Sequence, residues 1–96
     1  MKIQYTGHNV EINDNLKLQT QQKIEKLNTY HEHITSIHVT FSENNLKKIV
    51  EATVAIPGST LHAKSDANDH QSAVDSMIDK LARQLKKHKE KLEDRR

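Results

Sequence analysis

The C-terminal stretch, residues 69–96, carries the strongest periodic pattern in the sequence. Its apolar residues recur at three- and four-residue spacing: Val74, Met77, Ile78, Leu81, Ala82, Leu85 and Leu92. At about 100° of rotation per residue, these positions fall on one side of a helix. The pattern predicts one long helix with a single buried face, and Asp69 is the expected cap of its first turn.

A row of cations lies on another side of the same helix. Lys80, Arg83, Lys87 and Lys91 follow one another at spacings of 3, 4 and 4 residues, so their side chains stack along the helix. At about 1.5 Å of rise per residue, the row is about 16 Å long. Such a row suits a polyanion with spaced charges better than it suits a small molecule.

The formal net charge of +2 is unevenly distributed along the chain. From Lys80 onward there are eight Lys and Arg against three Asp and Glu, whereas residues 1–79 hold seven against ten. A charge asymmetry of this kind favours binding to nucleic acid or to another acidic surface. The alternative, a charged helix face that is simply solvated, stays open on these observations.

The rest of the chain predicts one more helix and four strands. Polar and apolar residues alternate in four segments, and a helical pattern with Asn13 as its N-cap extends to about Thr29. Turn residues at 43–45 and at Pro57-Gly58 predict that the last three strands form an antiparallel meander. The strands are expected at residues 2–6, 36–42, 50–56 and 61–66.

The element order is therefore β-α-β-β-β-α in a single domain that spans residues 1–96. Hydrophobic residues make up 33% of the chain and charged residues 29%, so the core must be thin. We expect an α+β fold in which both helices pack on one face of a four-stranded sheet. The other face should be wet and carry Thr40, Glu51, Thr53, His62 and Lys64.

Catalytic and metal sites are not predicted. The chain has no cysteine and only two glycines, so thiolate sites and a glycine-rich phosphate loop are excluded. Of the seven histidines only His31 and His33 are closely spaced, which is too few ligands for a metal. Asp75 and Asp79 lie one turn apart, and we expect them to pair with Lys80 or Arg83 or to be solvated. We expect no cofactor, no metal and no enzymatic activity.

Aromatic residues also limit the kind of nucleic-acid binding. The three present, Tyr5, Tyr30 and Phe41, are expected in or near the core, which leaves none to stack on bases. RNA would then be contacted through its phosphates and riboses. The N-terminus lacks the apolar run of a signal peptide and no segment has the length of a membrane span, so we expect a cytoplasmic protein.

Several segments resemble a known family. They are Ile78-Asp79-Lys80-Leu81-Ala82-Arg83-Gln84-Leu85-Lys86-Lys87-His88-Lys89, Thr6-Gly7-His8-Asn9-Val10-Glu11-Ile12, Lys23-x-x-Lys26-Leu27 and Leu61-His62-Ala63. These segments resemble those of the bacterial ribosome hibernation promoting factors of the short form, and the resemblance extends over the whole chain. The resemblance implies the β-α-β-β-β-α fold, which is similar to double-stranded RNA-binding domains.

The resemblance also implies a function. Members of the family bind the small ribosomal subunit in the channel for messenger and transfer RNA, and they block translation in stationary or starved cells. Carried over by position, the rRNA-binding residues are Lys23, Lys26, Lys80, Arg83, Lys86, Lys87 and Lys91. The short form implies action with a ribosome modulation factor, and we expect a monomer when the protein is free.

The chain departs from the family pattern at two places. Relatives often carry Asp-Met-Tyr-x-Ala-Ile-Asp where this sequence has Asp69-His70-Gln71-Ser72-Ala73-Val74-Asp75, so the expected aromatic contact is absent. The sequence also ends at Arg96, without the dimerisation domain of long-form relatives. A related ribosome-associated inhibitor has an extended tail that opposes ribosome pairing, and the short tail here favours pairing.

Two other functions stay open at this stage. One is a general double-stranded RNA-binding protein, for which a duplex of about 16 base pairs is the natural ligand. The other is a protein-interaction module whose last helix docks an acidic partner.

Overall fold

The element order predicted from the sequence is confirmed in the structure, a computed structural model. It describes residues 2–29 and 33–93, without the side chains of residues 28, 29 and 89–93. The elements are β1 (Lys2–Gly7), α1 (Asp14–Glu25), a 3-10 turn η1 (Lys26–Thr29), β2 (Ser36–Asn44), β3 (Lys47–Ile56), β4 (Ser59–Ala67) and α2 (His70–Glu93). The first helix changes to 3-10 geometry at Lys26, whereas the sequence pattern predicts one helix to Thr29.

The four strands form one sheet in the order β1-β2-β3-β4. β1 is parallel to β2, and the last three strands form the predicted antiparallel meander. The β2–β3 connection is shorter than predicted, because Asn44 pairs with Lys47 and leaves only Asn45 and Leu46 between the strands. Asn45 adopts a φ of 57°, a left-handed conformation that asparagine tolerates better than most residues. The Pro57-Gly58 turn lies where it was predicted, and Gly58 has a φ of 77°.

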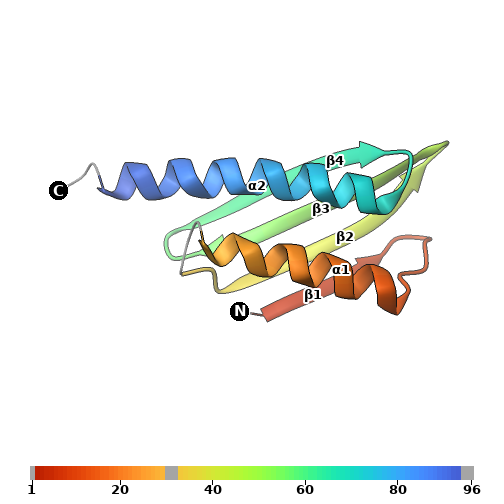
Figure 1. Ribbon diagram of the computed structural model, residues 1–96, viewed down its shortest axis with the longest axis horizontal. Coiled ribbons are helices and arrows are strands. Elements are labelled where there is room, and N and C mark those ends of the chain that lie inside the picture. Colours follow the sequence, from red (N-terminus) through yellow and green to blue (C-terminus); the bar gives the residue numbers. More distant parts are fainter. Residues whose placement is uncertain (1, 30–32, 94–96) are drawn as a thin grey trace.

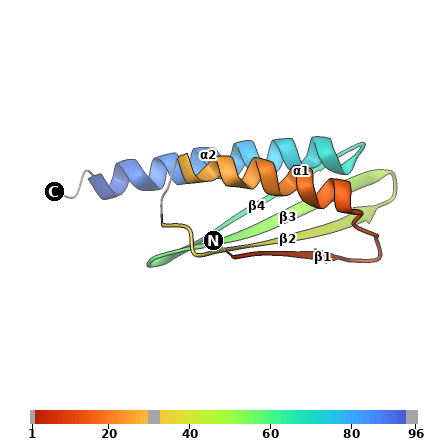
Figure 2. The same cartoon turned by 60° about the horizontal axis from the view of Figure 1, so that its bottom comes forward.

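Both helices cover the same face of the sheet, as Figures 1 and 2 show. α2 packs on β3 and β4, and α1 lies beside it on the β1 side. Between the layers lies the buried core, whose largest members are Phe41, Ile24, Leu27, Ile37, Met77, Leu81 and Leu85. The opposite face of the sheet is uncovered, as expected, and Glu51, His62 and Lys64 are exposed on it.

The apolar stripe of α2 contributes four large side chains to this core. Val74, Met77, Leu81 and Leu85 are each at most 1% exposed, and the hydroxyl of Ser65 on β4 donates to that of Ser76 on α2 at 3.1 Å. Beyond this contact zone the C-terminal part of α2 extends past the ends of β3 and β4 (Figure 1). No helix in residues 2–29 or 33–93 is long and apolar enough to span a membrane.

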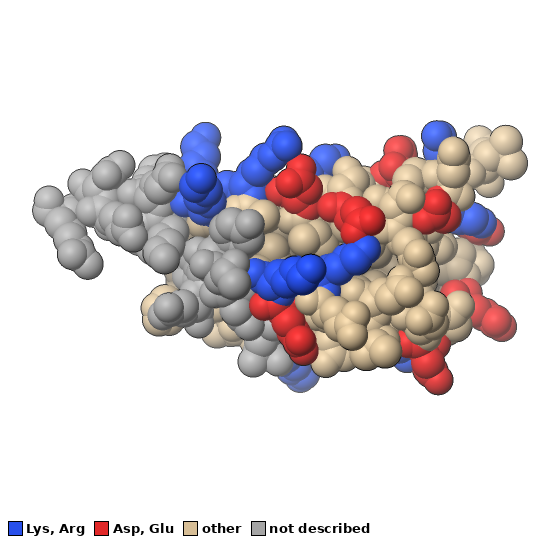
Figure 3. All heavy atoms as spheres, in the orientation of Figure 1, with Lys and Arg blue, Asp and Glu red and all other residues tan. Residues whose placement is uncertain are grey.

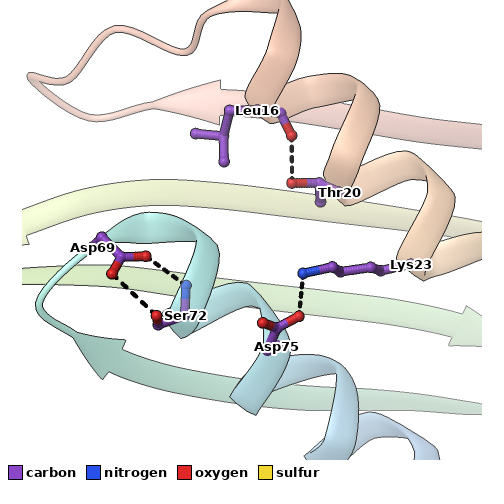
Figure 4. Close-up of polar contacts among 6 residues, drawn as sticks. All are labelled: Leu16, Thr20, Lys23, Asp69, Ser72 and Asp75. Carbon is purple, nitrogen blue, oxygen red and sulfur yellow. Dashed lines mark hydrogen bonds and ion pairs between the residues drawn. The ribbon is translucent and has the colours of Figure 1, made fainter.

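Both predicted helix caps are present. The side chain of Asn13 accepts from the backbone N–H of Leu16 at 2.8 Å. Asp69 accepts twice from Ser72, from the backbone N–H at 2.7 Å and from the hydroxyl at 3.0 Å (Figure 4). Each cap satisfies an N–H group that the first turn of a helix leaves without a partner, and each fixes where its helix begins.

Truncation of one core residue on α2 should therefore destabilise the whole fold. We expect Leu81→Ala to lower the free energy of unfolding by about 2–5 kcal/mol, because it removes buried methyl groups and leaves a cavity. Urea unfolding followed by circular dichroism measures this effect. Leu18→Ala is the matched control, since Leu18 is 55% exposed on α1, and it should change stability by less than about 0.5 kcal/mol. Equal losses in the two variants would contradict this description of the core.

Candidate nucleic-acid interface

The predicted row of cations lies on the exposed surface of α2. Lys80, Arg83 and Lys87 are exposed, and Lys91 lies in the part of α2 whose side chains are outside the described residues. Figure 3 shows Lys and Arg side chains gathered along α2 on the side of its C-terminal end. The apolar stripe produces this arrangement, because it fixes the rotation of the helix and leaves the cationic positions outside the core.

Lys80 is not simply directed into solvent. Its Nζ donates to the backbone carbonyl of Lys64 on β4 at 2.7 Å. Gln84, one turn further along the helix, donates to the carbonyl of His62 at 2.7 Å. The charge of Lys80 thus lies at the boundary between α2 and the edge of the sheet. The sequence analysis assigned no role to Gln84, although its spacing of four from Lys80 places it on the same side of the helix.

Two other cations are paired with carboxylates. Arg83 donates to Asp79 at 3.0 Å, which is the pairing expected for residues four apart on a helix. The expectation that Asp75 pairs with Lys80 or Arg83 is wrong, because Asp75 pairs with Lys23 of α1 (Figure 4). The reason is tertiary: Asp75 faces α1, which packs beside α2, whereas Lys80 lies on the β4 side.

The remaining predicted cations differ in their surroundings. Lys86 and Lys87 are exposed on α2, and the ion pairs found within the described part of the chain include neither of them. Lys26 is exposed at the start of η1. The structure thus places Lys23 on α1, Lys26 on η1 and the other four on α2, within one layer: Lys80, Arg83, Lys86 and Lys87.

The molecule is electrically polarised along its length. Figure 3 shows carboxylates between the cations of the helix layer and at the end opposite the C-terminus. At that end, near the start of α1, the β2–β3 turn and the start of α2, the acids Glu11, Asp14, Glu43, Asp66 and Asp69 outnumber the lysines of the β2–β3 turn, Lys47 and Lys48, of which Lys48 is paired with Glu43. A chain with this distribution would approach a polyanion with the C-terminal part of α2 leading.

The histidines form no metal site within the described residues. No group of three or more His, Cys, Asp or Glu in residues 2–29 and 33–93 is arranged to hold a metal ion, and His31 and Glu32 lie outside these residues. On the open sheet face, the ring of His38 lies 2.7 Å from the hydroxyl of Thr6, and that of His62 lies 3.2 Å from the hydroxyl of Thr53. These contacts are between neighbouring strands and support the sheet.

His70 occupies part of the segment that departs from the family pattern. Its ring meets Phe41 edge-on, with centroids 5.5 Å apart, and its Nε2 lies 3.0 Å from the carbonyl of Ser42. The ring therefore fastens the start of α2 to β2. The ring is partly buried and is held by contacts within the fold.

The hydrogen bonds from Ser72 lower the pKa of Asp69 below its ordinary value of 3.8. The backbone N–H contributes most and the hydroxyl next, because both stabilise the charged carboxylate. A negative charge at this point also suits the positive end of the helix dipole. The carboxylate thus helps to hold the start of the helix that carries the cations.

Comparison with known proteins identifies the family. Residues 3–93 match the family model described as "Sigma 54 modulation protein / S30EA ribosomal protein". The chain belongs to this family. The S30EA match covers every described strand and helix apart from Lys2 at the start of β1, and it includes every predicted cation.

Relatives in the S30EA family are similar over nearly their whole length. The ribosome hibernation promoting factor of Salmonella typhimurium is 40% identical over 92 residues, which are 96% of this chain and 97% of the relative. That of Escherichia coli K12 is 38% identical over the same shares of the two chains. These names agree with the resemblance found in the sequence.

Solved structures agree with the fold. A ribosomal subunit interface protein from Coxiella burnetii is 40% identical and superposes with a TM-score of 0.89, covering 93% of this chain and 98% of that one. The N-terminal domain of Thermus thermophilus Protein Y is 27% identical, with a TM-score of 0.85 over 92% of this chain and 99% of that one. The predicted α+β architecture is therefore confirmed.

The cap at Asp69 gives a pH dependence that can be measured. A carboxyl group whose pKa is lowered by folding stabilises the fold at pH values above its pKa in the unfolded chain. This contribution is lost as the pH falls through the pKa of the folded state. Asp69→Ala should therefore reduce stability at pH 7, and the loss should shrink as the pH falls below about 4. Urea unfolding at several pH values tests this.

Asn13→Ala is the matched control for this test, because the amide of Asn13 caps α1 without titrating. Its cost should be similar at every pH. A cost of Asp69→Ala that did not change with pH would contradict the assigned role of the charge.

Proposed function

We propose that this protein is a non-enzymatic ribosome hibernation factor that binds the small ribosomal subunit. The observation that carries the proposal is the exposed cationic surface of α2, with Lys86 and Lys87 free of ion pairs among the described residues. Membership of the S30EA family and the names of the relatives support it. None of the names reported above describes an enzyme.

On this proposal the protein occupies the channel for messenger and transfer RNA. Lysine and arginine side chains of α1 and α2 would contact rRNA phosphates, and the bulk of the domain would exclude the ligands of translation. Translation is then inhibited for as long as the protein stays bound. We further propose that it acts in stationary phase with a ribosome modulation factor and that it promotes ribosome pairing.

The mode of contact follows from the side chains available. Among the described residues, Phe41 is fully buried and Tyr5 is half-buried against the core, so neither offers a free ring to a base; Tyr30 lies outside these residues. The proposed interface is therefore made of charged contacts to phosphates, which fix position and orientation but carry little sequence information. Specific placement on the ribosome would come from the shape of folded rRNA.

A general double-stranded RNA-binding function is less well supported. Such domains usually contact a duplex of about 16 base pairs through its shape. On any RNA, Lys23 and Arg83 must give up a carboxylate and Lys80 a carbonyl. A free duplex lacks the folded shape of rRNA that would offset this cost, so we expect weak binding to it, which a gel shift measures.

Charge reversal on α2 should abolish binding to small subunits. We expect Arg83→Glu combined with Lys87→Glu to weaken binding at least about 100-fold, since each lost charged contact costs about 1.5 kcal/mol or more. Co-sedimentation with purified small subunits measures this loss. Circular dichroism should be unchanged, because both side chains are exposed.

The control is Lys2→Glu combined with Lys47→Glu, which changes the net charge equally. Lys2 lies on β1 and Lys47 in the first position of β3, and neither is part of the helix layer. This variant should bind within about threefold of the natural chain. Retained binding by the α2 variant, or equal loss by both variants, would refute the proposed interface.

Salt should weaken binding steeply. An interface with about six phosphate contacts is expected to lose about 1,000-fold in affinity between about 50 and 200 mM salt, because binding releases counterions from the RNA. A titration of small subunits at four salt concentrations gives the slope. A nearly flat response would point instead to a protein partner held by apolar contacts.

A further inference from the structure

Two carboxylates lie among the cations of the helix layer, and each holds one of them. Asp75 is paired with Lys23 across the α1–α2 contact, and Asp79 is paired with Arg83 along α2 (Figure 4 shows the first pair). The side chains of Asp75 and Asp79 are 62% and 63% exposed. Pairing therefore leaves both carboxylates accessible to any ligand that approaches this layer.

These carboxylates oppose the binding of a polyanion. A phosphate about 7 Å from a carboxylate in water is repelled by an amount that lowers affinity about threefold. In addition, Lys23 and Arg83 must exchange a carboxylate for a phosphate, whereas Lys86 and Lys87 have no ion pair to give up among the described residues. If the surface had only to bind RNA of any kind, Asp75 and Asp79 would be a disadvantage.

We propose that Asp75 and Asp79 are specificity-determining residues that weaken binding to generic RNA more than binding to the small subunit. This inference rests on the proposed function. Discrimination between partners commonly needs a repulsive element as well as attractive contacts. The two acids provide such an element at fixed positions within a cationic surface.

The two kinds of RNA differ in what they place opposite the carboxylates. A regular duplex carries closely spaced charges, so in any register a phosphate lies near Asp75 or Asp79. Folded rRNA at one fixed site can place a gap or a base amino group there instead, and carboxylates accept hydrogen bonds from the amino group of cytosine. The same two side chains would then lower the affinity for the duplex and leave the affinity for the small subunit almost unchanged.

The positions of the pairs suit this role. Asp75 and Asp79 lie one turn apart on α2, about 5–6 Å along the helix axis. Lys23 approaches from α1 on one side, and Arg83 follows on α2 itself. Together they form a short segment in which negative and positive charges alternate, next to the exposed Lys86 and Lys87. A ligand must match this alternation in order to use all the cations.

The test compares two ligands with the same variants. Asp75→Asn combined with Asp79→Asn keeps the size of both side chains and removes both charges. Affinity is measured for a 16-base-pair RNA duplex and for purified small subunits in the same buffer. We expect the variant to bind the duplex about tenfold more tightly and the subunits less than threefold more tightly, so that selectivity for subunits falls at least about threefold.

The matched control is Glu51→Gln combined with Asp66→Asn. Both residues are exposed on β3 and β4, on the open face of the sheet, and their replacement changes the net charge equally. This control should leave selectivity within about twofold of the natural value. Urea unfolding of each variant verifies that the fold is retained.

The outcomes separate the two proposals. If the natural chain binds subunits and the variant gains equally on both ligands, or on neither, the selectivity role is overturned and the proposed function stands. A loss of selectivity in the control as large as in the variant also overturns it, because net charge alone would then be responsible. If the natural chain does not bind small subunits, the proposed function is wrong and the inference is overturned with it.

Discussion

The structure depends on the burial of the apolar stripe of α2 against β3 and β4. Met77, Leu81 and Leu85 are fully buried, and they contact the strands of a chain that is only 33% hydrophobic. Because the helices cover one face only, this single layer of contacts sets both the rotation and the tilt of α2. The rotation in turn decides which residues are presented to a partner. One side of α2 thus packs in the core, and another side carries the proposed RNA contacts.

Most of the fold could be predicted from the sequence, because its signals are local. The period of the stripe, the caps at Asn13 and Asp69 and the Pro57-Gly58 turn each act within a few residues. The errors are local as well. η1 replaces the last turn of the first helix, and the β2–β3 turn is shorter because the strands pair as far as Asn44 and Lys47. Neither boundary has a residue pattern that would mark it.

The surface could be predicted less completely, because the partner of a charged side chain depends on tertiary packing. The Asp79–Arg83 pair follows from helical spacing alone. The partners of Lys23 and Lys80 do not, since they require the placement of α1 and of the edge of β4 beside α2. Sequence therefore indicates which cations are exposed, and the structure adds that Lys23, Lys80 and Arg83 are held by contacts within the chain.

The contacts of Lys80 and Gln84 with β4 have a consequence for self-association. β4 is an edge strand, and an unpaired edge offers its backbone groups to a strand from another molecule. Here two side chains of α2 occupy the carbonyls of His62 and Lys64. With these two carbonyls engaged, a strand from a neighbouring copy has fewer backbone acceptors to pair with, which disfavours edge-to-edge association along β4.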